Sequence, residues 1–85
     1  MRTINIRERI RYTRTIYQLT QENVANALCV SKQYITQIET DKKVATDKKL
    51  EEILNTIYKL GEGKKKGRLK DVSDDLKEIN KKNLE

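Results

Sequence analysis

Two candidate helix starts, Thr20 and Ser31, lie eleven residues apart in the run TQENVANALCVSKQYITQIE, and this spacing constrains the fold more than any other feature of the chain. Threonine and serine are favoured at helix N-caps, where the hydroxyl accepts a hydrogen bond from a free backbone N–H. The apolar spacing predicts short helices over 21–28 and 32–39, with two residues between the first helix and the second cap. The two helices must therefore join through a tight turn and cross steeply, which is the geometry of a helix-turn-helix.

Helical spacing also dominates the flanking sequence. A first helix is expected over about 5–16, with apolar residues near one face. Thr46 is a third candidate N-cap, and the residues after it carry a broad apolar stripe. The stripe consists of Leu50, Ile53, Leu54, Ile57, Tyr58 and Leu60. Because no run alternates as a strand does, the predicted fold class is all-α.

The composition changes near Gly61, which predicts two boundaries. Residues 1–60 carry most of the helically spaced apolar positions and form the predicted main domain. Residues 61–68, GEGKKKGR, hold all three glycines and a basic run, which is typical of a flexible linker. Residues 69–85 form a charged but amphipathic tail, which is expected to be a short C-terminal helix.

The tail has an apolar seam with steps of three and four residues. Its members are Leu69, Val72, Leu76, Ile79 and Asn83. This is about two heptads, whereas sustained coiled coils usually need about three or four. We therefore expect the tail either to pair subunits or to fold back on its own domain. A shorter helix starting near Ser73 is a further alternative, because Asp74 and Asp75 would lie favourably at its N-terminal end.

Charge and residue usage limit the functional classes. The chain has 19 Lys and Arg against 13 Asp and Glu, a net charge of +6, which favours a polyanionic partner without deciding the matter. There is no histidine and a single cysteine, Cys29, so a zinc site and Ser-His or Cys-His catalysis are excluded. We therefore expect that the protein is not an enzyme and that it binds no metal or cofactor. No run resembles a signal peptide or membrane span, so a cytoplasmic location is expected.

One face of the second helix of the motif is polar. If Ile35 and Ile38 point inward, then four side chains face outward together, namely Lys32, Gln33, Thr36 and Gln37. Glutamine can pair with adenine through two hydrogen bonds, and lysine can donate to the acceptors of guanine. The row is therefore suited to contacts with base edges, although the same residues would also serve as a solvated helix face.

At this point the sequence resembles the lambda-repressor-like superfamily, specifically its Xre/Cro-type helix-turn-helix domains. The similar stretches are IRERIRYTR (6–14), LTQENVANAL (19–28), VSKQYITQIE (30–39) and the DKK at 41–43. The resemblance covers about residues 4–60 and involves several residue types at fixed spacings. It implies a compact bundle of four or five helices that binds double-stranded operator DNA, usually as a dimer, with the third helix in the major groove.

The resemblance also implies roles for individual residues. The base-contacting positions fall on Lys32, Gln33, Thr36 and Gln37. The DNA-backbone positions fall on Gln21, Ser31, Tyr34, Lys42 and Lys43, with Gln21 at the phosphate-binding start of the second helix. Arg14 and Glu39 occupy positions that often form a semi-buried ion pair. Arg7, Arg9 and Arg11 are weaker candidates for phosphate contacts.

Three residues depart from the family pattern at helix ends. Gln18, Cys29 and Asp41 stand where the family frequently has glycine, and Ala45 replaces a frequent proline. Aspartate tolerates the left-handed backbone conformation fairly well, whereas cysteine adopts it at some cost. These departures raise a question about turn geometry more than about the fold.

The expected function is a sequence-specific transcriptional regulator of double-stranded DNA, a repressor of phage, plasmid or mobile-element type. The alternative is an antitoxin or restriction-modification controller that also binds a protein partner through residues 69–85. A less favoured alternative is an interaction adaptor without DNA binding. A homodimer on a palindromic site is expected, formed through Ile57, Tyr58 and Leu60 with help from the tail seam.

Overall fold

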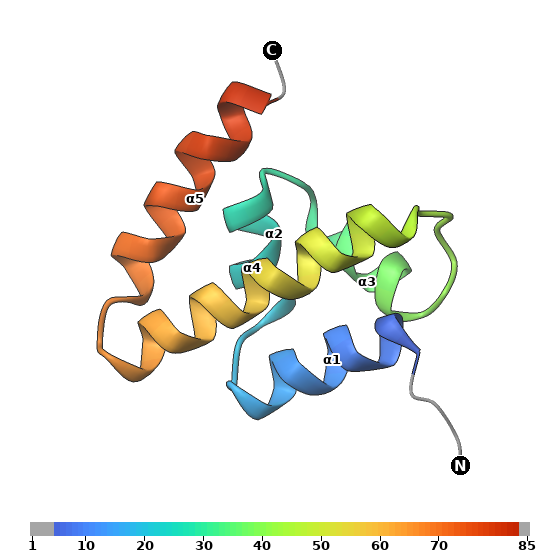
Figure 1. Cartoon of the computed structure of the whole chain (residues 1–85), viewed down its shortest axis with the longest axis horizontal. Helices are drawn as coiled ribbons and strands as arrows, with labels where there is room; N and C mark the ends of the chain where they lie inside the picture. Colours follow the sequence, from blue (N-terminus) through green and yellow to red (C-terminus); the bar gives the residue numbers. More distant parts are fainter. Residues whose placement is uncertain (1–4, 84–85) are drawn as a thin grey trace.

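The computed structural model describes residues 5–83, which form five helices and no strand (Figure 1). The helices are α1 (Ile6–Ile16), α2 (Gln21–Leu28), α3 (Lys32–Glu39), α4 (Asp47–Lys65) and α5 (Leu69–Asn83). The predicted all-α class is confirmed, and the five observed helices agree with the predicted bundle of four or five helices with a helical tail. None of these helices combines the length and the apolar character needed to cross a membrane.

The helix starts follow from side-chain capping. Each of the first four helices is preceded by an extended residue whose side chain accepts a hydrogen bond from the backbone N–H three positions later. These N-caps are Asn5, Thr20, Ser31 and Thr46, so the three caps predicted from the sequence are present. At α2 the cap is reciprocal, because the Asn23 side chain also accepts from the Thr20 backbone N–H.

The ends of α1, α2 and α3 adopt the left-handed conformation at the three positions where glycine is absent. Gln18, Cys29 and Asp41 have φ angles of 57°, 58° and 60°. In each turn the next backbone N–H bonds to a carbonyl five residues earlier, as in the Leu19 N–H to Arg14 bond of 3.0 Å. Residues with side chains therefore form the left-handed turns that glycine would form without strain, at a steric cost.

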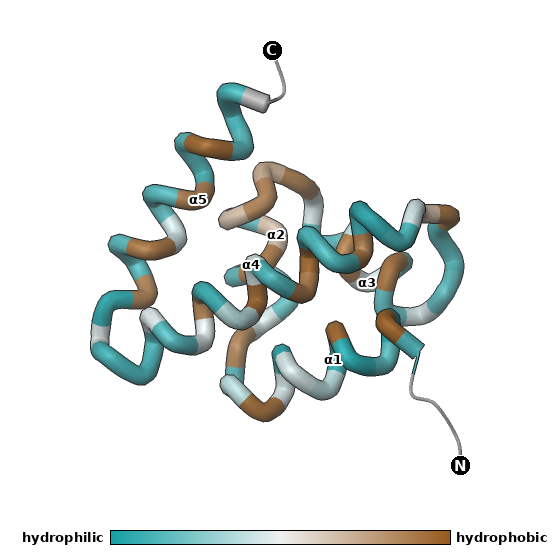
Figure 2. The backbone as a smooth tube through the Cα atoms, viewed as in Figure 1, coloured by the Kyte–Doolittle hydropathy of each residue, from teal (hydrophilic) through white to brown (hydrophobic). Residues whose placement is uncertain are grey.

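The core lies where the five helices meet. Its largest fully buried side chains are Ile10, Val24, Ile35, Ile38, Ile53, Ile57 and Leu60. Figure 2 shows why each helix contributes, since hydrophobic positions recur along every one of them between hydrophilic positions. The expectation that Ile57 and Leu60 belong to the dimer contact is wrong, because both side chains are buried in the chain's own core with an exposed fraction of 0%. Only Tyr58 of that trio is exposed.

The prediction of a flexible linker over 61–68 is also wrong for residues 61–65, which are helical. Gly61 and Gly63 are buried inside α4, which continues to Lys65, and the turn to α5 is confined to residues 66–68. A Cβ at Gly61 would collide with the ring of Tyr17, and a Cβ at Gly63 would lie 2.6 Å from Cγ2 of Val72. These two glycines allow close approach of α1 and α5 to α4 rather than flexibility.

The α1–α4 contact at Gly61 is reinforced by polar groups around Tyr17. Its hydroxyl donates to Glu62 Oε1 at 2.8 Å, and Lys65 Nζ lies 5.3 Å from the ring centroid. The ring packs edge-on against Tyr58, with the two centroids 6.3 Å apart. The hydrogen bond to the Glu62 carboxylate, together with burial, raises the pKa of Tyr17.

The tail helix packs on its own domain, against α2 and α4, so the fold-back alternative describes this chain. Leu76 is buried, and Leu69 and Val72 are half-buried against the core. The Asn80 side-chain amide donates to the Ala27 carbonyl of α2 at 2.8 Å. The helix begins at Leu69 rather than near Ser73. Residues 84 and 85 of the predicted tail lie outside the described residues.

Candidate nucleic-acid interface

The helix-turn-helix is formed by α2 and α3, whose facing sides are apolar. Val24 and Ala25 of α2 are buried together with Ile35 and Ile38 of α3. The small side chain of Ala25 allows α3 to cross close to α2. Between the helices, the backbone N–H of Val30 donates to the Ala25 carbonyl at 3.0 Å, which closes the turn. This packing fixes which side of α3 faces solvent.

The solvent-facing side of α3 carries the four predicted base-contacting residues. Lys32 and Gln33 are exposed, whereas Thr36 and Gln37 are half-exposed. The side chains of Lys32, Gln33 and Gln37 make no hydrogen bond or ion pair within residues 5–83, so their polar groups are available to a ligand. Thr36 differs, because its hydroxyl lies 2.8 Å from Gln21 Oε1 and 3.2 Å from the Lys32 carbonyl oxygen.

The buried carboxylate of Glu39 links α1, α2 and α3 behind this row of polar side chains. Glu39 has a side chain that is only 3% exposed, and Arg14 donates to it through Nε at 2.7 Å and Nη2 at 3.0 Å. This is the two-point geometry that guanidinium and carboxylate groups favour. The ion pair implied by the resemblance is therefore present. Arg14 also donates to the Leu19 carbonyl at 2.9 Å, which ties α1 to the loop before α2.

Gln21 belongs to the same network. Its amide nitrogen donates to Glu39 Oε1 at 3.2 Å, and its amide oxygen accepts from Thr36. Both ends of the side chain are thus engaged within the protein. A phosphate at the start of α2 would meet the free backbone N–H groups there, with Gln21 held in place beside it.

The other predicted backbone-contacting residues lie around the ends of α3. Ser31 is exposed at the N-cap, and its oxygen accepts from the Tyr34 backbone N–H at 3.0 Å. Lys42 and Lys43 are exposed in the loop after α3. Lys43 Nζ lies 5.8 Å from the centroid of the Tyr34 ring, so these two candidates meet although they come from different segments.

Arg7, one of the three weaker candidates for phosphate contacts, has a structural role that sequence reasoning missed. Arg7 donates to the Ile38 carbonyl at 2.9 Å and to the Lys43 carbonyl at 2.8 Å, and its Nε lies 3.1 Å from Asp41 Oδ1. It therefore fixes the end of α3 and the loop that carries the two lysines. Its spacing of seven residues from Arg14 is a signal for this role, because both then lie on one face of α1.

The geometry of α2 and α3 agrees with a sequence comparison. A family model described as helix-turn-helix matches residues 10–57, more than half of the 85-residue chain. The chain belongs to the Cro/C1-type helix-turn-helix family. Proteins of this lambda-repressor-like family are DNA-binding transcription regulators, and this chain is accordingly a DNA-binding regulator. No curated protein and no solved structure matched the chain.

The matched span of this Cro/C1-type regulator runs from α1 into α4, so it includes the whole helix-turn-helix and the Arg14–Glu39 pair. It leaves out the last residues of α4 and all of α5. Gly61 and Gly63 therefore lie outside the part that the family model covers, although Tyr17, which packs against Gly61, lies within it.

Proposed function

We propose that this regulator is a sequence-specific repressor of phage, plasmid or mobile-element type that acts in the cytoplasm. In this proposal α3 enters the major groove of duplex DNA, and Lys32, Gln33, Thr36 and Gln37 contact base edges. The observation that carries the proposal is the polar face of α3, where three of these four side chains have no partner within residues 5–83. The opposite face is fixed by the buried Ile35 and Ile38.

Repression requires only that the protein occupy a promoter-proximal site, and the proposed contacts suffice for occupancy. The alternative of an antitoxin or controller depends on a protein partner for residues 69–85. The seam that would serve such a partner lies against α2 and α4, and Ile79 is its only exposed aliphatic side chain among the described residues. We therefore favour direct repression.

The base contacts can be tested on DNA enriched from a random pool by the unaltered protein. Gln33→Ala and Gln37→Ala should each lower affinity for the enriched sequence by about 1–3 kcal/mol, because each removes a base-edge contact. Affinity for random DNA should be almost unchanged. Asn55→Ala is the matched control, since this amide is exposed on α4.

Two results would count against the function. If the unaltered protein enriches no sequence, then the protein is not a sequence-specific regulator. If the glutamine variants lose affinity for enriched and random DNA equally, then α3 does not carry the specificity.

We further propose that the repressor binds a palindromic operator as a two-fold dimer, with half-sites about 34 Å apart. A groove of about 500 Å³ between α4 and α5 supports this proposal. Its floor includes Gly63, Val72 and Leu76, and the exposed Ile79 lies at its edge. The rim carries Lys59, Glu62, Lys66, Arg68 and Asp75. A rim with both signs of charge can pair with its own copy across a two-fold axis.

Ile79→Lys tests this interface without touching the core. We expect this variant to be monomeric by light scattering and to lose cooperative binding to a palindromic site. Ile16→Lys is the matched control, because Ile16 is also an exposed isoleucine, at 77%, but lies at the end of α1. A dimer that survives Ile79→Lys, or an unaltered protein that is monomeric at high micromolar concentration, would refute the proposed interface.

A further inference from the structure

Three arginines follow one face of α1. Arg7, Arg11 and Arg14 are separated by four and three residues, so they lie within about 60° of one another around the helix axis. Arg9 is two residues from Arg7 and lies on a different side of the helix. The arginines of α1 therefore fall into two groups with different surroundings.

The two outer arginines of this face are occupied by α3 and the loop after it. Arg7 holds the carbonyls of Ile38 and Lys43, and Arg14 holds the carboxylate of Glu39. The face of α1 that carries them is therefore turned toward the C-terminal end of α3. Arg7 is joined in this way to the Lys42–Lys43 loop, and Arg14 is joined through Glu39 to Gln21 at the start of α2.

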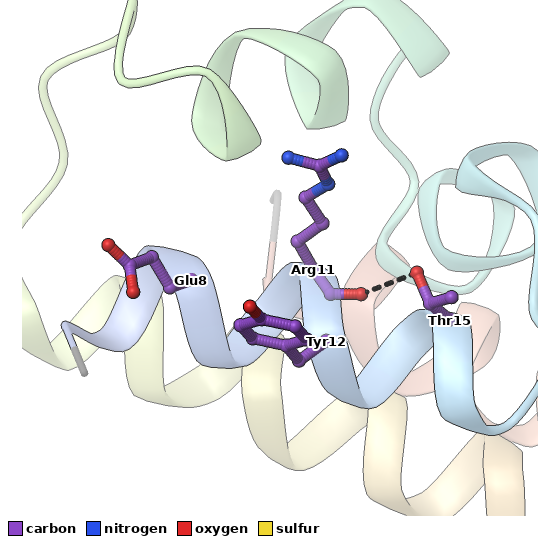
Figure 3. Close-up of a pocket in the computed structure, with 4 residues that line it drawn as sticks. All are labelled: Glu8, Arg11, Tyr12 and Thr15. Carbon is purple, nitrogen blue, oxygen red and sulfur yellow. Dashed lines mark hydrogen bonds between the residues drawn. The ribbon is translucent and has the colours of Figure 1, made fainter.

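Arg11 lies between these two points but is exposed, and its guanidinium makes no hydrogen bond or ion pair within residues 5–83. Figure 3 shows its side chain extending away from α1 on the side of α2 and α3, with Glu8 and Thr15 one turn away on either side. The Thr15 hydroxyl donates to the Arg11 carbonyl at 2.9 Å, so it leaves the guanidinium free. These residues, with Tyr12, line a surface hollow of about 430 Å³.

We propose that Arg11 binds a phosphate of the DNA backbone and thereby adds α1 to the DNA-contacting surface. The inference rests on the proposed function, because it takes the start of α2 and the Lys42–Lys43 loop to be the two places where DNA strands approach. A guanidinium between them can form two parallel hydrogen bonds with one phosphate, which a lysine cannot reproduce. The contact adds affinity and position rather than sequence preference.

The chain contains its own control for this experiment. Arg9 and Arg11 are both exposed arginines of α1 without a partner among the described residues, and they differ in the side of the helix that they occupy. Arg11→Gln and Arg9→Gln therefore remove the same charge from the same helix. Thermal unfolding of both variants should match that of the parent, because neither side chain packs in the core.

The first measurement is the salt dependence of binding to the enriched sequence and to random DNA. Loss of one phosphate contact makes the negative slope of log K against log salt shallower by about 0.9. The affinity gap between the parent and Arg11→Gln should therefore shrink about threefold between 50 and 200 mM salt on both DNAs. Arg9→Gln should keep the slope of the parent.

The second measurement locates the phosphate. Single methylphosphonate substitutions remove one backbone charge at a time from the enriched sequence. We expect one position whose neutralisation weakens the parent and Arg9→Gln but leaves Arg11→Gln unaffected. If Arg11→Gln and Arg9→Gln behave alike in both measurements, the inference is overturned while the proposed function stands. Failure of the parent to enrich any sequence would instead remove the proposed function.

Discussion

The ring of Tyr17 occupies the space that a side chain at Gly61 would need, so α1 and α4 meet at a position that admits only glycine. Alanine in a helix interior is normally more stable than glycine by about 1 kcal/mol. Here the collision outweighs that preference, because a rigid ring must move. We expect Gly61→Ala to lower the free energy of unfolding by about 1–3 kcal/mol, the usual cost of overpacking, as measured by urea denaturation.

The ring can be removed to test this explanation. In a Tyr17→Ala background the same Gly61→Ala change should become neutral or stabilising, because only helix propensity then remains. If Gly61→Ala is equally destabilising in both backgrounds, Tyr17 is not the cause.

Removal of either partner of the Arg14–Glu39 pair should destabilise the fold. Both side chains are largely buried, at 16% and 3% exposed, so the remaining charge would stay without its partner. We expect a loss of a few kcal/mol for Arg14→Met or Glu39→Gln, with about 3–5 kcal/mol as the upper limit. The double variant should lose less than the sum of the single losses in chemical denaturation. Additive losses would show that the two groups do not depend on each other.

Lys42 and Lys43 should act on DNA through phosphates rather than bases. Replacement of either by alanine should weaken binding to enriched and random DNA alike and reduce the salt slope by about one unit. Lys48→Ala is a suitable control because Lys48 is exposed on α4. A slope that stays at the value of the unaltered protein would remove the substituted lysine from the interface.

Gln18 offers a gain in stability. Its φ of 57° costs an L-residue about 1–2 kcal/mol of strain. Glycine would remove this strain, but it also has a greater entropy in the unfolded chain, so only part of the gain remains. We expect Gln18→Gly to raise the free energy of unfolding by about 0.5–1 kcal/mol. Asn55→Gly in the middle of α4 should instead lower it by about 1 kcal/mol. A drop at both positions would contradict the strain argument.

Tyr17 should link stability to high pH. Because its pKa is raised in the folded state, that state holds the phenolic proton more tightly than the unfolded chain does. The contribution is present below the ordinary tyrosine pKa of about 10 and is lost as the pH rises through the folded-state pKa. Ultraviolet titration should find one of the four tyrosines ionising later than the rest. Tyr17→Phe or Glu62→Gln should abolish this late phase.

The features that local chemistry controls could be predicted from the sequence. The caps at Thr20, Ser31 and Thr46 depend on a hydroxyl and an N–H three residues away, so they are visible in a short window. The bounds of α2 and α3 follow from them. The Arg14–Glu39 pair came from the family resemblance, because no local pattern links residues on different helices.

The errors share a physical cause, which is that the partner lies far away in the chain. Glycine in a basic run is typical of a linker, and nothing near Gly61 indicates that Tyr17 will press against it. Likewise, the sequence alone does not distinguish Arg7 from the other arginines of α1, because its partner, the Ile38 carbonyl, lies on α3. The sequence of the α5 seam fits a second copy as well as its own domain. Leu69, Val72 and Leu76 pack on the chain's own core, and only the packing surface on α2 and α4, which is distant in sequence, accounts for this.

The packing of α5 determines how this protein can be cut or tagged. Its Asn80 side chain holds the last turn of α2 through the Ala27 carbonyl, and Leu76 completes the core. A fragment ending with the family match at residue 57 would therefore leave the back of the helix-turn-helix open to water. The smallest piece expected to bind DNA extends at least to Asn80. A fluorophore or affinity handle belongs after α5, because an insertion within 61–68 would separate surfaces that touch.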